Sequence, residues 1–166
     1  MKRAHRNARS FASVLGETND LSAKMSALDA GPLSLFQKVL LTTDGTVTGL
    51  IELYAGETIR VRKIDQKIIR DVAPVELGVP MGTPLLQRRI LLSGKTENYL
   101  FAESLFVFDQ LSTSTQRRLL ESDEPIGLIW RDERIETYRE IIEHRLEICR
   151  TVAAYFALSA NTPILS

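Results

Sequence analysis

Two apolar runs joined by a short turn constrain the fold of this chain more than any other feature. The run Pro84–Leu92 (PLLQRRILL) and the run Tyr99–Phe108 (YLFAESLFVF) flank the turn-forming residues Ser93–Thr96 (SGKT). Two strand-like runs with a short glycine-bearing connection between them predict a β-hairpin. Both runs are too apolar for a hairpin with one face in water, so we expect this hairpin to lie centrally in a sheet.

The segment before the hairpin predicts a third strand. Over Glu57–Asp71, apolar Ile59 and Val61 alternate with arginines, which is typical of an antiparallel strand with one solvated face. Asp65 and Gln66 predict a bend between two halves of this strand. Together with helical segments elsewhere, these strands predict the α+β class, an antiparallel β-sheet with helices packed on it.

Apolar residues recur every three or four positions in several other segments, which is the spacing of an amphipathic helix. This pattern predicts helices over Leu33–Leu41, Ser114–Leu120 and Glu133–Leu158. The segment Thr46–Tyr54 fits either a strand or a short helix, because it is rich in β-branched residues but short. Pro125–Gly127 predicts a turn.

The two ends of the chain differ from its middle. Residues 1–30 are mostly polar with scattered apolar side chains, so we expect a weakly ordered N-terminal arm that holds at most a short helix over Leu21–Leu28. The domain proper is then residues 31–166. Ile164–Ser166 is typical of the first residues of a strand, and we therefore expect a C-terminally incomplete domain.

Charge and hydropathy argue against several classes of protein. The 21 basic and 21 acidic residues give a formal net charge of zero, whereas a nucleic-acid-binding domain is usually strongly basic. No apolar stretch approaches the roughly 20 residues of a membrane-spanning helix. The first acidic residue is Glu17, and this basic start makes organelle targeting an alternative to a solvated tail. Because Cys149 is the only cysteine, we expect a reduced, cytoplasmic protein without an internal disulfide or a metal site.

The residue types most often used in catalysis are scarce. The two histidines are His5, in the arm, and His144, which falls on the charged face of the expected C-terminal helix. Cys149 falls on the apolar face of the same helix, where we expect a buried structural thiol. The sequence contains no glycine-rich phosphate loop and no nucleophile elbow. These residues therefore predict no nucleophile, general base or metal ligand.

Arg88 is the informative residue. In an extended strand Leu86, Arg88 and Ile90 project from the same face, so the arginine lies among aliphatic neighbours in an interior strand. Arginine cannot shed its charge, and burial without an anionic partner is very costly. The partner is either Glu103 on the facing strand or the carboxylate of a ligand, which a guanidinium holds with two parallel hydrogen bonds. The residue pattern alone favours the internal ion pair.

Four segments, in order, resemble the chorismate pyruvate-lyase (4-hydroxybenzoate synthase) family, and in particular its divergent branch. They are LLTTDGTVT (Leu40–Thr48), LLQRRILL (Leu85–Leu92), YLFAES (Tyr99–Ser104) and PIG (Pro125–Gly127). The resemblance runs from Leu40 to Trp130 and implies the family's fold, a chorismate lyase-like antiparallel sheet with helices packed on it.

The resemblance also implies a function, the conversion of chorismate to 4-hydroxybenzoate and pyruvate by an elimination that uses neither a metal nor a cofactor. In this chain it implies that Arg88 binds the ring carboxylate and that Val47 lines the pocket. Ile126, followed by Gly127, would supply a loop contact. The family's late-strand glutamate has no counterpart before Ser166, so the resemblance assigns no catalytic residue and leaves the activity of this chain open.

A second function is compatible with the same residues. Effector-sensing domains of some bacterial transcription repressors share this fold in the family's wider group, and such a domain would need the arginine pocket without turnover. The alternative is therefore a non-catalytic domain that binds or senses an aromatic carboxylate. In either case we expect a small-molecule partner, neither nucleic acid nor a membrane, and the sequence does not indicate an oligomeric state.

Overall fold

The computed structural model describes residues 33–43, 46–136, 143 and 145–166. The chain divides into two units, Met1–Thr42 and Thr43–Ser166. The expected arm over residues 1–30, its helix over Leu21–Leu28 and His5 lie outside the described residues. Within the described part of the chain, no helix is long and apolar enough to cross a membrane.

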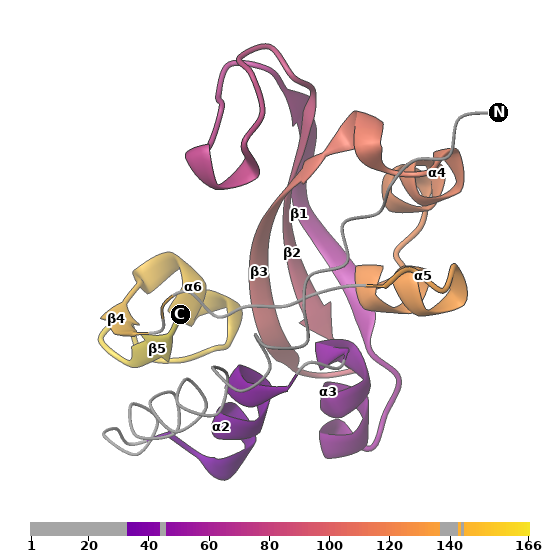
Figure 1. Cartoon of the computed structure of the whole chain (residues 1–166). Coiled ribbons are helices and arrows are strands. Elements are labelled where there is room, and N and C mark those ends of the chain that lie inside the picture. Colours follow the sequence, from indigo (N-terminus) through magenta and orange to yellow (C-terminus); the bar gives the residue numbers. More distant parts are fainter. Residues whose placement is uncertain (1–32, 44–45, 137–142, 144) are drawn as a thin grey trace, which may run out of the picture. The chain divides into compact units, whose positions relative to one another are not determined.

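The second unit is built on a three-stranded antiparallel sheet in the order β1-β2-β3 (Figure 1). Its strands are β1 (Arg60–Ile69), β2 (Leu85–Ser93) and β3 (Asn98–Val107). The turn of the hairpin is closed by the Gly94 amide, which donates to the Glu97 carbonyl at 2.9 Å. The predicted hairpin and the third strand are thus confirmed, and β2 lies between the other two strands.

A β-bulge interrupts β1 close to the expected bend. Lys63 is paired with Ile90, but the next paired residue is Asp65, which lies opposite Arg89. Ile64 is therefore an extra residue on β1. A bulge of this kind shifts which side chains of the bulged strand face each side of the sheet.

The described part of the chain contains five α-helices, of which the first belongs to the first unit and the others to the second. They are α2 (Leu35–Thr42), α3 (Val47–Ala55), α4 (Thr113–Glu121), α5 (Ile126–Asp132) and α6 (Arg150–Tyr155) within the described residues. The helix expected near Leu33–Leu41 is confirmed by α2, and α3 shows that the ambiguous segment is helical. Short 3-10 turns, η2 (Val75–Leu77) and η3 (Phe108–Gln110), lie in the connections on either side of the hairpin.

The core places α4 and α5 on one face of the sheet. Leu86 of β2, Leu119 of α4 and Ile129 of α5 form a buried cluster, and each of these side chains is at most 1% exposed. The Ser112 hydroxyl caps α4 by accepting a hydrogen bond from the Thr115 amide at 3.0 Å. This cap satisfies one of the amides that a helix start leaves unpaired and fixes where α4 begins. The α+β architecture expected from the sequence is confirmed.

The prediction of one long C-terminal helix over Glu133–Leu158 is wrong. The described part of this segment contains a strand, β4 (Leu146–Ile148), followed by the short helix α6. Strand β4 pairs antiparallel with β5 (Pro163–Leu165), so the strand expected at Ile164–Ser166 does form. Pairing with a segment that lies far along the chain overrides local helical spacing, because it satisfies the same backbone groups.

The predictions for Cys149 and His144 depended on this long helix. Cys149 is the N-cap residue of α6 and is partly exposed, so it is not a buried thiol on an apolar helix face. His144 lies outside the described residues.

The prediction of a turn at Pro125–Gly127 is also wrong, because Pro125 is the N-cap residue of α5 and Ile126 is its first helical residue. Three residues are too few to distinguish a turn from the first turn of a helix.

Candidate functional site

Arg88 lies at the middle of β2 and is the largest fully buried side chain among the described residues, with 1% of its surface exposed. It shares a sheet face with Leu86, which packs under α4 and α5. Among the described residues, neither Nε nor Nη2 of Arg88 has a hydrogen-bond partner. A buried cation with two unmatched donors is rare in folded proteins, and such donors are able to bind an anion.

The two unmatched donors of Arg88 have a specific geometry. The Nε–H and Nη2–H bonds lie on the same edge of the guanidinium and point in parallel, which is the arrangement that holds both oxygens of a carboxylate. Burial lowers the pKa of Arg88, but an arginine remains protonated in proteins. The site is therefore a fixed positive charge in an apolar setting, where attraction for an anion is stronger than in water.

The ion pair between Arg88 and Glu103 that the residue pattern favoured does not form. The strand register places Ser104 opposite Arg88, and Glu103 opposite Arg89. A register difference of one residue moves a side chain to the other face of a sheet. On that other face the Gln87 amide donates to Glu103 at 3.3 Å.

Two polar residues that the sequence did not single out flank Arg88. Gln66 of β1 and Ser104 of β3 are its direct partners in the two neighbouring strands. The Gln66 Oε1 atom is buried and has no hydrogen-bond partner among the described residues. The signal that could have revealed Gln66 is the bulge, and the sequence showed only a bend near this position.

Three of the expected site residues lie at the starts of two helices. Val47 is the first residue of α3, and Ile126 and Gly127 open α5. A Cβ atom added at Gly127 would lie 3.3 Å from Cγ2 of Thr46, so the starts of α3 and α5 are in contact. The structure therefore brings these residues, which are about 80 positions apart in sequence, into one region.

Ile126 connects this region to the sheet. Its side chain packs against the core cluster that contains Leu86. Leu86 and Arg88 are two residues apart in β2 and project from the same face. The expected apolar loop contact and the buried arginine thus lie on the same side of the sheet.

A network of charged and hydroxyl groups fixes α5 against α4. Arg118 of α4 binds Glu124 before α5 at 2.7 Å and Asp132 at the end of α5 at 3.0 Å. The buried Thr115 hydroxyl donates to Glu133 at 2.6 Å. This hydrogen bond is the main cause that lowers the pKa of Glu133. The network holds both ends of α5 and so positions Ile126.

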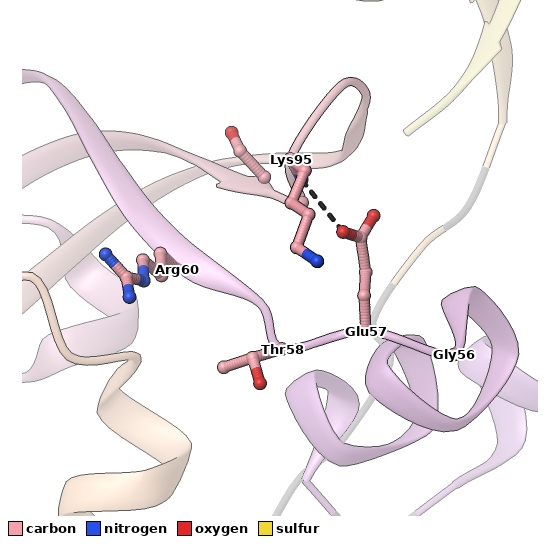
Figure 2. Close-up of a pocket in the computed structure, with 7 residues that line it drawn as sticks. Gly56, Glu57, Thr58, Arg60 and Lys95 are labelled. Carbon is pink, nitrogen blue, oxygen red and sulfur yellow. Dashed lines mark hydrogen bonds between the residues drawn. The ribbon is translucent and has the colours of Figure 1, made fainter.

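A separate hollow of about 610 Å³ lies between the α3–β1 connection and the hairpin turn (Figure 2). Glu57 crosses it and accepts hydrogen bonds from the Lys95 amide at 3.0 Å and from the Tyr99 hydroxyl at 3.2 Å. Burial and the hydrogen bond to Glu57 raise the pKa of Tyr99. Ser93 at its rim is five strand residues from Arg88, or roughly 16 Å, so the hollow is distinct from the arginine site.

The fit between Glu57 and the hairpin turn predicts the effect of Gly94→Ala. A Cβ atom at position 94 would clash with the Glu57 Oε1 atom, so the carboxylate has to shift and its hydrogen bonds from the Tyr99 hydroxyl and the Lys95 amide are weakened. We expect Gly94→Ala to lower the free energy of unfolding by about 1 kcal/mol in urea denaturation. In a Glu57→Ala background the same substitution should cost much less, and an equal cost in both backgrounds would contradict this account.

Metal-binding potential is low in the described segments, which contain no group of three or more His, Cys, Asp or Glu residues placed to hold an ion.

Comparison with known proteins identifies relatives over most of the chain. The model of the family described as chorismate pyruvate-lyase Rv2949c-like matches residues 41–166. A chorismate pyruvate-lyase of Mycobacterium leprae is 42% identical over 107 residues, which are 62% of this chain and 50% of that protein. The chorismate pyruvate-lyase of Mycobacterium tuberculosis is 32% identical over 110 residues, which are 62% of this chain and 55% of that protein.

A similar protein is found in a third organism. A putative lyase of Methanocaldococcus jannaschii is 34% identical over 116 residues, which are 66% of this chain and 55% of its own length. This chain therefore spans about half the length of the curated relatives it matches.

Among solved structures, PhnF from Mycobacterium smegmatis has a similar fold, with a TM-score of 0.59. The likeness covers 75% of this chain and 55% of that chain at 16% identity, and it concerns the fold alone. The family model, in contrast, matches well over half of the sequence and includes the segments that carry Val47, Arg88 and Ile126. The chain belongs to the chorismate pyruvate-lyase Rv2949c-like family.

Proposed function

We propose that this protein converts chorismate to 4-hydroxybenzoate and pyruvate without a cofactor, in a site centred on Arg88. The observation that carries the proposal is the buried guanidinium whose two parallel donors have no partner among the described residues. Family membership supports the reaction class, since two matched relatives are chorismate pyruvate-lyases. The lone cysteine supports a reducing, cytoplasmic location.

The chemistry of the substrate matches this site. Chorismate is a dianion, and Arg88 would hold its ring carboxylate through two parallel hydrogen bonds. The bond between the ring and the enolpyruvyl oxygen breaks, with its electron pair leaving on the oxygen. The ring loses one proton, and the released enolate takes up one proton on carbon to become pyruvate. Because the ring becomes aromatic, the product supplies the driving force. The protein has to orient the ether and exclude water, which are effects of positioning and environment.

Val47, Ile126 and Gly127 would form the apolar wall of the pocket. Ile126 packs on the cluster that contains Leu86, next to Arg88 along β2, and Gly127 lies against Thr46 at the start of α3. An apolar wall keeps water away from the guanidinium and strengthens its attraction for the carboxylate. A Cβ atom at position 127 would lie 3.3 Å from Thr46 Cγ2, so a side chain there requires a small shift of Thr46.

The proposal predicts turnover of chorismate by the purified protein. We expect 4-hydroxybenzoate and pyruvate to form in equal amounts, without added metal or cofactor, when the products are followed by chromatography. Folding is checked by circular dichroism, and binding of 4-hydroxybenzoate by isothermal titration calorimetry. A folded protein that binds 4-hydroxybenzoate but forms no product would favour the alternative, a domain that binds or senses an aromatic carboxylate. A folded protein that neither binds nor reacts would exclude both functions.

A further inference from the structure

The three strands place a row of polar side chains across one face of the sheet. Gln66, Arg88 and Ser104 are directly opposite one another in β1, β2 and β3. Directly opposite residues of antiparallel strands project from the same face, with Cβ atoms about 4.5–5.5 Å apart. The three side chains therefore lie side by side on the face that α4 and α5 cover.

The bulge in β1 decides which residue stands next to Arg88. Lys63 lies opposite Ile90, so an uninterrupted strand would place Asp65 opposite Arg88, two residues farther along. The extra residue instead moves Asp65 to the other face, where it forms an ion pair with Arg89 at 3.0 Å. A neutral amide, Gln66, takes the place beside Arg88. Because of the bulge, the residue of β1 beside the buried arginine is not a carboxylate.

Two members of the row, Gln66 and Arg88, have unused hydrogen-bonding groups. Among the described residues, the Nε and Nη2 atoms of Arg88 and the Oε1 atom of Gln66 are buried without a hydrogen-bond partner. Buried polar groups left unpaired are costly, so several of them side by side indicate a common ligand. Because a glutamine amide can turn about its last bond, Gln66 can present either its oxygen or its NH₂ group at the same place.

We propose that Gln66 and Ser104 donate hydrogen bonds to the ring carboxylate that Arg88 binds, so that Gln66 is a specificity-determining residue; this inference rests on the proposed function. A carboxylate accepts about four hydrogen bonds, and the guanidinium supplies two of them. The amide and the hydroxyl on either side supply the others. Being neutral, they add donors without competing with the ligand for the cation.

The first test compares matched glutamine variants by calorimetric titration with 4-hydroxybenzoate. Gln66→Leu should weaken binding about tenfold, because it removes one hydrogen bond to a charged group. Gln87→Leu is the control, since Gln87 lies in β2 on the opposite face and binds only Glu103 among the described residues. Unchanged affinity of Gln66→Leu would overturn the inference. If Gln66→Leu binds normally but Arg88→Met loses binding, the proposed function stands and only the role of Gln66 is rejected. If the wild-type protein itself does not bind 4-hydroxybenzoate, the proposed function is contradicted, and not the role of Gln66 alone.

A second variant tests the position of residue 66 without any ligand. Gln66→Glu places a carboxylate beside Arg88, so the melting temperature of the ligand-free protein should rise above that of the wild type. Affinity for 4-hydroxybenzoate should fall at least tenfold, because the new carboxylate occupies the same donors. A melting temperature at or below the wild-type value would show that residue 66 does not face Arg88 and would overturn the inference. Ser104→Ala should weaken binding by a smaller factor.

Discussion

Arg88→Met should abolish most of the affinity for 4-hydroxybenzoate while the protein keeps its fold. The loss should be roughly 1.5–3 kcal/mol or more, the contribution of hydrogen bonds to a charged group. The free energy of unfolding should be unchanged or higher, because methionine retains most of the aliphatic stem and the variant no longer buries a cation without a partner. Calorimetric titration measures the first quantity and urea denaturation the second.

Arg89→Met is the matched control for this experiment. Arg89 is the next residue in β2 but projects from the other face, where it pairs with Asp65 in a partly exposed ion pair. Such pairs contribute little to stability, so this variant should retain both binding and fold. If Arg88→Met instead lowered the free energy of unfolding by roughly 3–5 kcal/mol, an internal anion would have lost its partner, and the ligand role would be contradicted.

Ile129→Ala should produce the largest loss of stability in the core. Ile129 is completely buried between Leu86 and Leu119, where α5 meets the sheet. Removing its side chain leaves a cavity in this cluster, and we expect the free energy of unfolding to fall by about 2–5 kcal/mol. Because the cluster also positions Ile126, affinity for 4-hydroxybenzoate should fall as well.

Leu53→Ala is the comparison for the core substitution. Leu53 lies in α3 and is 81% exposed, so its truncation creates no cavity. Its effect on the free energy of unfolding should stay within about 0.5 kcal/mol. A loss below 1 kcal/mol for Ile129→Ala would indicate that α5 is not held to the sheet by this cluster.

The central hairpin shows what local pattern predicts well. Apolar runs on both sides of a glycine-bearing turn specify two paired strands, because both the turn and the strands depend on neighbouring residues. The same periodicity identified Arg88 as a charged residue among aliphatic neighbours, and the structure shows it to be 1% exposed. The apolar repeat after Glu133 predicted a helix wrongly, because the structure of that segment depends on residues outside it. There, β4 forms by pairing with β5, whose residues lie 15 to 19 positions farther along the chain and outside the repeat itself.

The residues that lie beside Arg88 in the sheet could not be predicted from the sequence. Register between strands sets whether Glu103 or Ser104 lies opposite the arginine, and a difference of one residue exchanges the two faces of the sheet. The bulge in β1 then decides that Gln66, and not Asp65, is the neighbour on the other side. The sequence alone determined that this chain would bury a permanent cation in an interior strand, because alternation and charge are properties of nearby residues. Only the tertiary structure decided that the cation has no internal carboxylate beside it, because that depends on the alignment of three strands whose pairing is a long-range property of the chain.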